Sequence, residues 1–119
     1  MLKILVVDDV PSELELICRI LQEAGMSVIR AGDGAEAIAS IRKTPPDLVI
    51  LDVVMPRMNG FEVIRELREN EETKNLPVVF CTQKNTELDQ TWGTDLGADA
   101  YLGKPFEPQQ LLNIVRRLA

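Results

Sequence analysis

Short apolar runs alternate along this chain with longer segments in which apolar residues recur at helical spacing. The runs at residues 4–7 and 48–51 are apolar at every position, which is typical of strands buried on both faces of a parallel sheet. The predicted strands are residues 4–7, 27–31, 48–51, 77–81 and 99–102, and the predicted helices are residues 11–24, 34–43, 61–69, 86–96 and 108–118. Five strands alternating with five helices predict an α/β fold, with helices on both faces of the sheet.

Polar residues stand where four of the five predicted strands end. Asp8 and Asp9 follow the first strand, Asp52 the third, Thr82 the fourth and Lys104 the fifth. Ligands of open parallel sheets bind outside the carboxyl ends of the strands. We therefore expect these residues to share one edge of the sheet and to form the functional site.

Length and charge exclude several classes of protein. The 119 residues are the size of one domain, to which we assign residues 1–119. A net charge of −6 argues against binding nucleic acid, which requires basic patches. The absence of histidine excludes a Ser-His-Asp triad and imidazole metal ligands. The N-terminal apolar run is too short for a signal peptide or a membrane span, so we expect a cytoplasmic protein that does not insert into membranes.

Each site residue also has an ordinary structural explanation. An aspartate after a strand is most often a helix cap or turn residue, and a lone lysine is usually a solvated surface charge. The two cysteines, Cys18 and Cys81, lie within apolar runs and are expected to be buried free thiols. The joint pattern is more informative. Three carboxylates crowded at one sheet edge need a hard cation, Mg²⁺ or Mn²⁺, while a lysine and a hydroxyl beside them suit a tetrahedral oxyanion.

The same residues lie in motifs that resemble the receiver domain of two-component response regulators. The motifs are Asp8-Asp9, residues 48–56 with Asp52, Asn59-Gly60, Thr82, and residues 97–106 with Lys104-Pro105. The resemblance covers the whole chain. It implies the flavodoxin-like strand order 2-1-3-4-5 of CheY-like proteins, which the alternation of elements alone does not establish.

The resemblance implies a role for each acidic residue. Asp52 is expected to be the nucleophile that takes a phosphoryl group from a histidine of a partner protein. Asp9 is expected to bind Mg²⁺ directly and Asp8 mainly through water. Asp52 and the backbone carbonyl of Val54 complete the expected set of protein ligands.

The resemblance also implies a switch. Lys104 is expected to pair with a phosphoryl oxygen, and the peptide bond between Lys104 and Pro105 to be cis. Thr82 is expected to move its hydroxyl onto the phosphate, and Tyr101 to follow from an outward to an inward rotamer. Phosphate contacts would thereby bias a two-state element.

Two further residues have both a structural and a functional interpretation. Gln83 departs from the usual receiver pattern, which has a small residue after the threonine, and is expected either to cover the phosphoryl group or to face solvent. Trp92 lies in a helical row with Leu88 and Leu96, which is either a core-edge stripe or a partner-facing surface. The segment from Thr82 to Pro105 is similar to CheY-like regulators of twitching motility and phototaxis pili, the PilH type.

The sequence thus predicts a single-domain response regulator of a histidine-to-aspartate phosphorelay. The expected partners are a sensor histidine kinase or histidine phosphotransfer protein and a downstream protein target. The expected catalysis is limited to the chain's own phosphorylation and dephosphorylation.

A receiver-fold interaction module that does not use phosphorylation is the main alternative. An aspartate-nucleophile phosphatase would need a second aspartate where Val54 stands, and a flavodoxin would need a phosphate loop after the first strand. The start at Met1 and the lack of a linker-like tail favour a stand-alone regulator over an excised domain.

Overall fold

Five parallel strands form one sheet in the order β2-β1-β3-β4-β5 in the computed structural model, which describes residues 1–119. The strands are β1 (Lys3–Val7), β2 (Ser27–Ala31), β3 (Leu48–Leu51), β4 (Val78–Thr82) and β5 (Ala100–Gly103). The helices are α1 (Pro11–Glu23), α2 (Gly34–Lys43), α3 (Gly60–Glu69), α4 (Glu87–Asp95) and α5 (Pro108–Leu118). The expected fold class, element order and strand order are confirmed.

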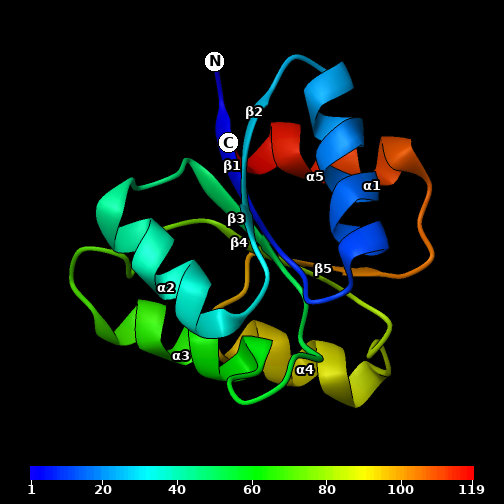
Figure 1. The fold of residues 1–119 in the computed structure, drawn as a ribbon. Coiled ribbons are helices and arrows are strands. Elements are labelled where there is room, and N and C mark those ends of the chain that lie inside the picture. Colours follow the sequence, from blue (N-terminus) through cyan, green and yellow to red (C-terminus); the bar gives the residue numbers. More distant parts are fainter.

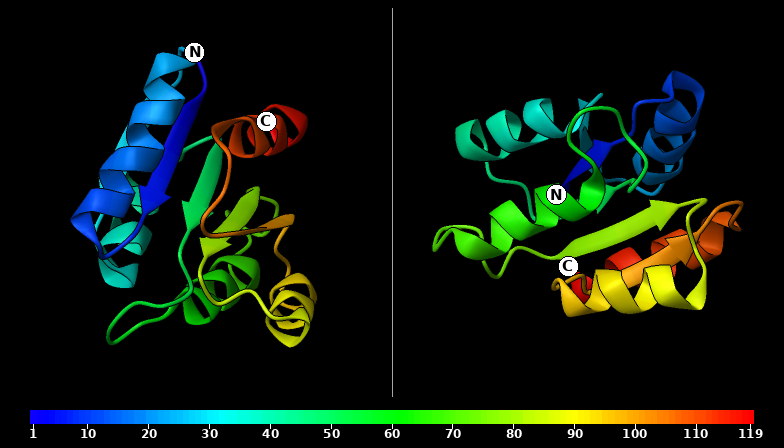
Figure 2. Two further views of the ribbon diagram at one scale, coloured as in Figure 1. Left: turned by 90° about the vertical axis from the view of Figure 1, so that its right-hand side faces the viewer. Right: turned by 90° about the horizontal axis from the view of Figure 1, so that it is seen from below.

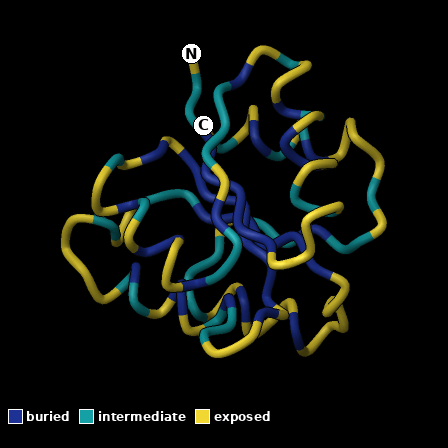
Figure 3. Tube along the Cα trace, viewed as in Figure 1, coloured by how far each residue is buried: buried dark blue, intermediate teal, exposed yellow.

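The helices cover both faces of the sheet. Helices α1 and α5 lie on one face, and α2, α3 and α4 lie on the other (Figures 1 and 2). Alternate residues of a strand point to opposite faces, so Ile4 and Val6 join the core beneath α1 and α5, whereas Leu5 and Val7 join the core on the other face. Figure 3 shows the buried residues concentrated in the central strands β1, β3 and β4, which explains why residues 4–7 and 48–51 are apolar at every position.

Side-chain caps set the starts of two helices, each of which begins one residue away from the start that the periodicity predicts. The side chain of Asn59 accepts a hydrogen bond from the backbone of Glu62, so α3 begins at Gly60. Thr86 caps α4 in the same way, and that helix begins at Glu87. Gly60 leaves no room for a side chain, because a Cβ there would lie 2.4 Å from the carbonyl oxygen of Asp52. No helix is both long and apolar enough to cross a bilayer.

The hydrogen bonding of the sheet extends one residue past the ends of several strands and fixes the candidate residues there. The backbone N–H of Asp8 donates to Ala31, and that of Asp52 donates to Val7. The N–H of Lys104 donates to the carbonyl of Thr82, the last residue of β4. Asp8, Asp52, Thr82 and Lys104 are thereby held at one edge of the sheet, as the sequence predicts.

The two cysteines take no part in this site. Cys18 and Cys81 are buried, unpaired thiols, as expected. Burial raises the pKa of the Cys81 thiol to about 12, with the charge of Lys104 opposing the shift. That thiol is therefore protonated and unreactive at neutral pH.

Candidate functional site

Two buried aspartates form the centre of the site. Asp8 follows β1 and Asp52 follows β3, and the two residues are 1% and 6% exposed. Each uses one carboxylate oxygen to accept a backbone N–H two residues further on, from Val10 at 2.9 Å and from Val54 at 3.1 Å. These local hydrogen bonds orient the carboxylates and leave the second oxygen of each for another partner.

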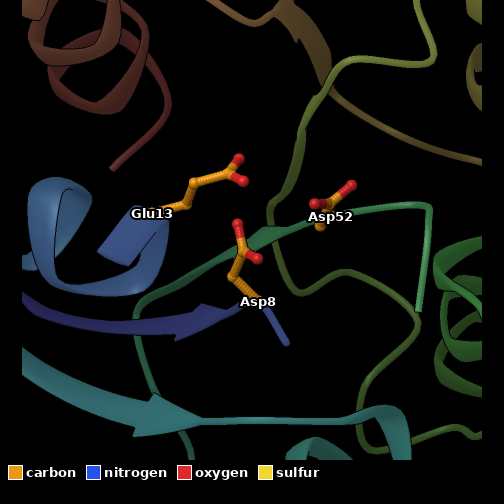
Figure 4. Close-up of side chains that lie close together, drawn as sticks. All are labelled: Asp8, Glu13 and Asp52. Atoms are coloured by element: carbon orange, nitrogen blue, oxygen red, sulfur yellow. The ribbon is translucent and has the colours of Figure 1, made fainter. Parts of the chain in front are cut away.

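That partner is the ammonium group of Lys104, which follows β5. Its Nζ donates to Asp8 Oδ2 at 2.6 Å and to Asp52 Oδ2 at 3.1 Å. A third carboxylate, Glu13 in the first turn of α1, accepts from the same Nζ at 2.5 Å. Figure 4 shows the side chains of Asp8, Glu13 and Asp52 pointing toward one another. The peptide bond between Lys104 and Pro105 is cis, as expected.

Burial and ion pairing shift the pKa values of the central groups. Burial raises the pKa of Asp8, and this outweighs the opposing hydrogen bonds from Lys104 and the Val10 backbone. Burial alone would lower the pKa of Lys104, but its hydrogen bonds to Asp8 and Glu13 and the charge of Asp52 raise it overall. Lys104 therefore stays charged at neutral pH, and one ammonium faces three carboxylates, so the site has an excess of negative charge.

The oxygen atoms of this cluster fit a hard divalent cation. One carboxylate oxygen each from Asp8, Glu13 and Asp52 lies within 4.8 Å of the others. Oxygen-only donors with excess negative charge suit Mg²⁺ or Mn²⁺. Asp9 is exposed and lies outside this group, next to Asp8 in the chain. Asp9 as a direct ligand, with Asp8 acting through water, stays a prediction, as does the carbonyl of Val54.

Thr82 and Tyr101 occupy the neighbouring strands β4 and β5. Thr82 is fully buried, and its hydroxyl accepts the backbone N–H of Lys84 at 3.2 Å. The hydroxyl of Tyr101 donates to the carbonyl of Lys84, so both side chains are bound to the same residue of the β4–α4 loop. The Tyr101 ring packs on Phe80 with the ring centroids 5.5 Å apart. Burial, followed by the charges of Asp89 and Asp52, raises the Tyr101 pKa to about 12.

Gly93 is needed because the Tyr101 ring lies against α4. A Cβ at Gly93 would lie 2.8 and 2.9 Å from two carbons of that ring and 3.1 Å from a ring carbon of Phe80. The glycine within the fourth helix is thus explained by the close approach of the sheet.

Gln83 and Trp92 both lie on the surface. Gln83 lines a groove of about 490 Å³ between α1 and the loop after β5, together with Glu13, Lys104 and Phe106. Trp92 is 52% exposed and Leu88 is 60% exposed, whereas Leu96 is partly buried and packs against the core, so the row on α4 runs from the core edge to the surface. The Trp92 ring packs edge-on against Phe61 of α3, at 6.4 Å between ring centroids.

Glu13 is the one member of the cluster that sequence reasoning missed. An acidic residue in the first turn of a helix is ordinarily explained by the helix dipole, and its sequence neighbours give no other indication. Its partner Lys104 is 91 positions away, so only the packing of α1 beside the β5–α5 loop brings the two together. The sequence alone therefore carries no signal for this contact.

Comparison with known proteins agrees with this geometry. Residues 4–116 match the family described as the response regulator receiver domain. The chain is 39% identical to protein PilH of Pseudomonas aeruginosa over 97% of this chain and 95% of that protein. It is 41% identical to the DNA-binding response regulator MtrA of Mycolicibacterium smegmatis, but spans about half of that protein, 49% of its length.

Solved structures show the same architecture. The chemotaxis protein CheY4 of Vibrio cholerae superposes with a TM-score of 0.93 at 37% identity, over 100% of this chain and 99% of that one. A putative response regulator from Chloroflexus aurantiacus gives a TM-score of 0.94 at 36% identity, over 98% and 96% of the two chains.

Proposed function

The chain belongs to the response regulator receiver family, and on that premise we propose that it is a single-domain response regulator phosphorylated on Asp52. The observation that carries the proposal is the position of the Asp52 carboxylate. It is buried at the end of β3, with one oxygen held by the backbone of Val54 and the other by Lys104. A carboxylate oriented in this way beside an ammonium is placed to act as a nucleophile toward an anionic phosphoryl group.

The proposed reaction transfers a phosphoryl group between two side chains. An oxygen of Asp52 forms a bond to phosphorus, and the bond between phosphorus and an imidazole nitrogen of the donor breaks. The imidazole leaves with that electron pair and takes up a proton. Because this chain has no histidine, the donor is a phosphohistidine of a sensor kinase or of a phosphotransfer protein. Lys104 offers N–H groups to the phosphoryl oxygens, and the chain's catalysis is limited to gaining and losing this group.

The proposed cofactor is Mg²⁺, for which Mn²⁺ can substitute. Asp8, Asp9, Asp52 and the backbone carbonyl of Val54 would hold it. The metal, when bound, offsets the negative charge of the carboxylates and the phosphoryl oxygens. The closeness of the Asp8 and Asp52 carboxylates and the excess negative charge around them support a metal here.

The proposed switch uses the hydrogen bonds of the β4–α4 loop. If Thr82 turns its hydroxyl to a phosphoryl oxygen, it gives up the N–H of Lys84, to whose carbonyl Tyr101 is also bound. The β4–α4 loop and the Tyr101 ring then move together. Because the ring lies against Gly93, its movement also shifts α4. The exposed Trp92 and Leu88 on that helix offer the surface that a downstream protein reads.

The proposed setting is motility or taxis in the cytoplasm. The sequence similarity to PilH-type regulators and the structural similarity to a chemotaxis protein support this setting. The acidic chain is not expected to bind nucleic acid or to insert into a membrane itself.

Acetyl phosphate with and without Mg²⁺ tests the proposal, with intact-mass analysis as the readout. Wild type should gain the mass of one phosphoryl group only when Mg²⁺ is present, and Asp52→Asn should gain none. A wild type that stays unlabelled while folded and able to bind Mg²⁺ would instead favour the phosphorylation-independent interaction module.

A further inference from the structure

Glu13 competes for the hydrogen-bonding capacity of Lys104. An ammonium has three N–H donors, and the Lys104 Nζ contacts three carboxylates, those of Asp8, Glu13 and Asp52. No donor is therefore free for a phosphoryl oxygen in this state. At least one carboxylate has to give up its hydrogen bond before Lys104 can bind the phosphoryl group.

The three carboxylates differ in what else they do. Asp52 is the proposed nucleophile, and its contact with Lys104, at 3.1 Å, is the longest of the three. Asp8 is fixed by the Val10 backbone and belongs to the proposed metal site. Glu13 accepts no hydrogen bond other than that of Lys104, and its side chain is 32% exposed. Its carboxylate can therefore rotate away without breaking any other hydrogen bond.

Glu13 also lies on the accessible side of Lys104. The groove between α1 and the β5–α5 loop is lined by Glu13, Leu16 and Phe106 and reaches Lys104. An anionic donor that approaches Lys104 along this groove meets the Glu13 carboxylate first. The charge of Glu13 opposes that approach, because a partly desolvated like-charge contact is screened less than one in bulk water.

We propose that Glu13 is a positioning residue that occupies Lys104 in the unphosphorylated state and slows phosphorylation by competing with the incoming phosphoryl group. This inference rests on the proposed function of Asp52. When the phosphoryl group binds Lys104, it replaces the Glu13 carboxylate at the ammonium group.

The test compares Glu13→Gln with wild type for labelling by acetyl phosphate at saturating Mg²⁺. The second-order rate constant should rise about three- to tenfold, because a unit negative charge beside the phosphoryl position is removed. The change should fall on the half-saturating concentration of acetyl phosphate more than on the maximal rate, since Glu13 opposes entry of the donor. A role confined to stabilising α1 would not produce this split.

Glu15→Gln is the matched control. Glu15 is on the same helix and pairs with Arg30 at 2.5 Å, away from Lys104. This variant removes the same charge and one ion pair, and its labelling should follow wild type. Thermal unfolding of both variants shows whether they are folded.

Three results would overturn the inference. If Glu13→Gln is labelled no faster than Glu15→Gln, Glu13 does not compete with the phosphoryl group for Lys104, while the proposed function of Asp52 stands. A loss of Mg²⁺ affinity of more than about tenfold by calorimetry, with slower labelling, would show that Glu13 supports metal binding instead of opposing the donor. A wild type that is never labelled would overturn the proposed function together with this inference.

Discussion

Replacing Lys104 with methionine should destabilise the protein strongly in the absence of divalent cations. The variant keeps most of the side-chain volume but removes the ammonium that three carboxylates share. Removing one partner of a buried ion pair costs about 3–5 kcal/mol. Because Glu13 is partly exposed and can turn to water, we expect a loss of about 2–4 kcal/mol in the free energy of unfolding at pH 7.

Mg²⁺ should recover much of this loss. A cation at the cluster supplies the missing positive charge, and a ligand at about 100 times its dissociation constant adds about 2.7 kcal/mol. The variant should gain more stability from Mg²⁺ than wild type does, because Lys104 no longer repels the metal. Urea unfolding in EDTA and in excess Mg²⁺ measures both effects.

Lowering the pH should also reduce the loss in the free energy of unfolding that Lys104→Met causes. The folded-state pKa of Asp8 is raised, so its ionised form costs stability above that pKa and the cost disappears as the pH falls through it. Lys74→Met is the matched control, since Lys74 pairs with Glu71 on the surface and its loss should cost at most about 1 kcal/mol. Lys104 does not stabilise the cluster as described if Lys104→Met is as stable as Lys74→Met in EDTA, or if Mg²⁺ stabilises the variant no more than it stabilises wild type.

Three further predictions concern the switch and its surroundings. Gly93→Ala should lower the free energy of unfolding by about 0.5–2 kcal/mol in urea, since overpacking against Tyr101 outweighs the helix propensity of alanine, whereas the exposed neighbour Thr94→Ala should be neutral or stabilising. Tyr101 is the single tyrosine, and its ultraviolet titration should have a midpoint of about 12. Its neutral form is favoured by folding, so stability should fall as the pH rises from about 10 to 12. A midpoint near the unfolded value of about 10 in folded protein would show that the ring is not packed against Phe80 and Gly93. Gln83→Ala should lose its phosphoryl group faster than wild type after donor removal, because Gln83 borders the groove that reaches Lys104, and an unchanged decay would show that Gln83 only shapes the surface.

The order of secondary-structure elements could be predicted because the central strands are buried on both faces and the helices have apolar residues at helical spacing. Residues 48–51 are apolar throughout and form β3 with the expected bounds. Other elements begin one residue away from the predicted position where a side-chain cap sets the end, as Asn59 does for α3. The order of the strands came from the resemblance to receivers, since the alternation does not say which strands pair.

The candidate site could be predicted in part. Asp8, Asp52, Thr82 and Lys104 meet at the sheet edge because parallel strands bring their carboxyl ends together. Glu13 could not be predicted, because its contact depends on how α1 packs beside a loop 91 positions away. The exposure of Trp92 also depends on tertiary packing, since helical spacing does not say which side of α4 meets the sheet.

The most direct test of the account is to locate the phosphoryl group on the chain. Borohydride reduces an aspartyl phosphate to homoserine, and peptide mass spectrometry then identifies the residue that was modified. After treatment with acetyl phosphate and Mg²⁺, we expect homoserine at position 52 and at no other aspartate. Homoserine at position 8 or 9 with Asp52 intact would contradict it, because the carboxylate that Lys104 and the Val54 backbone orient would not then be the nucleophile.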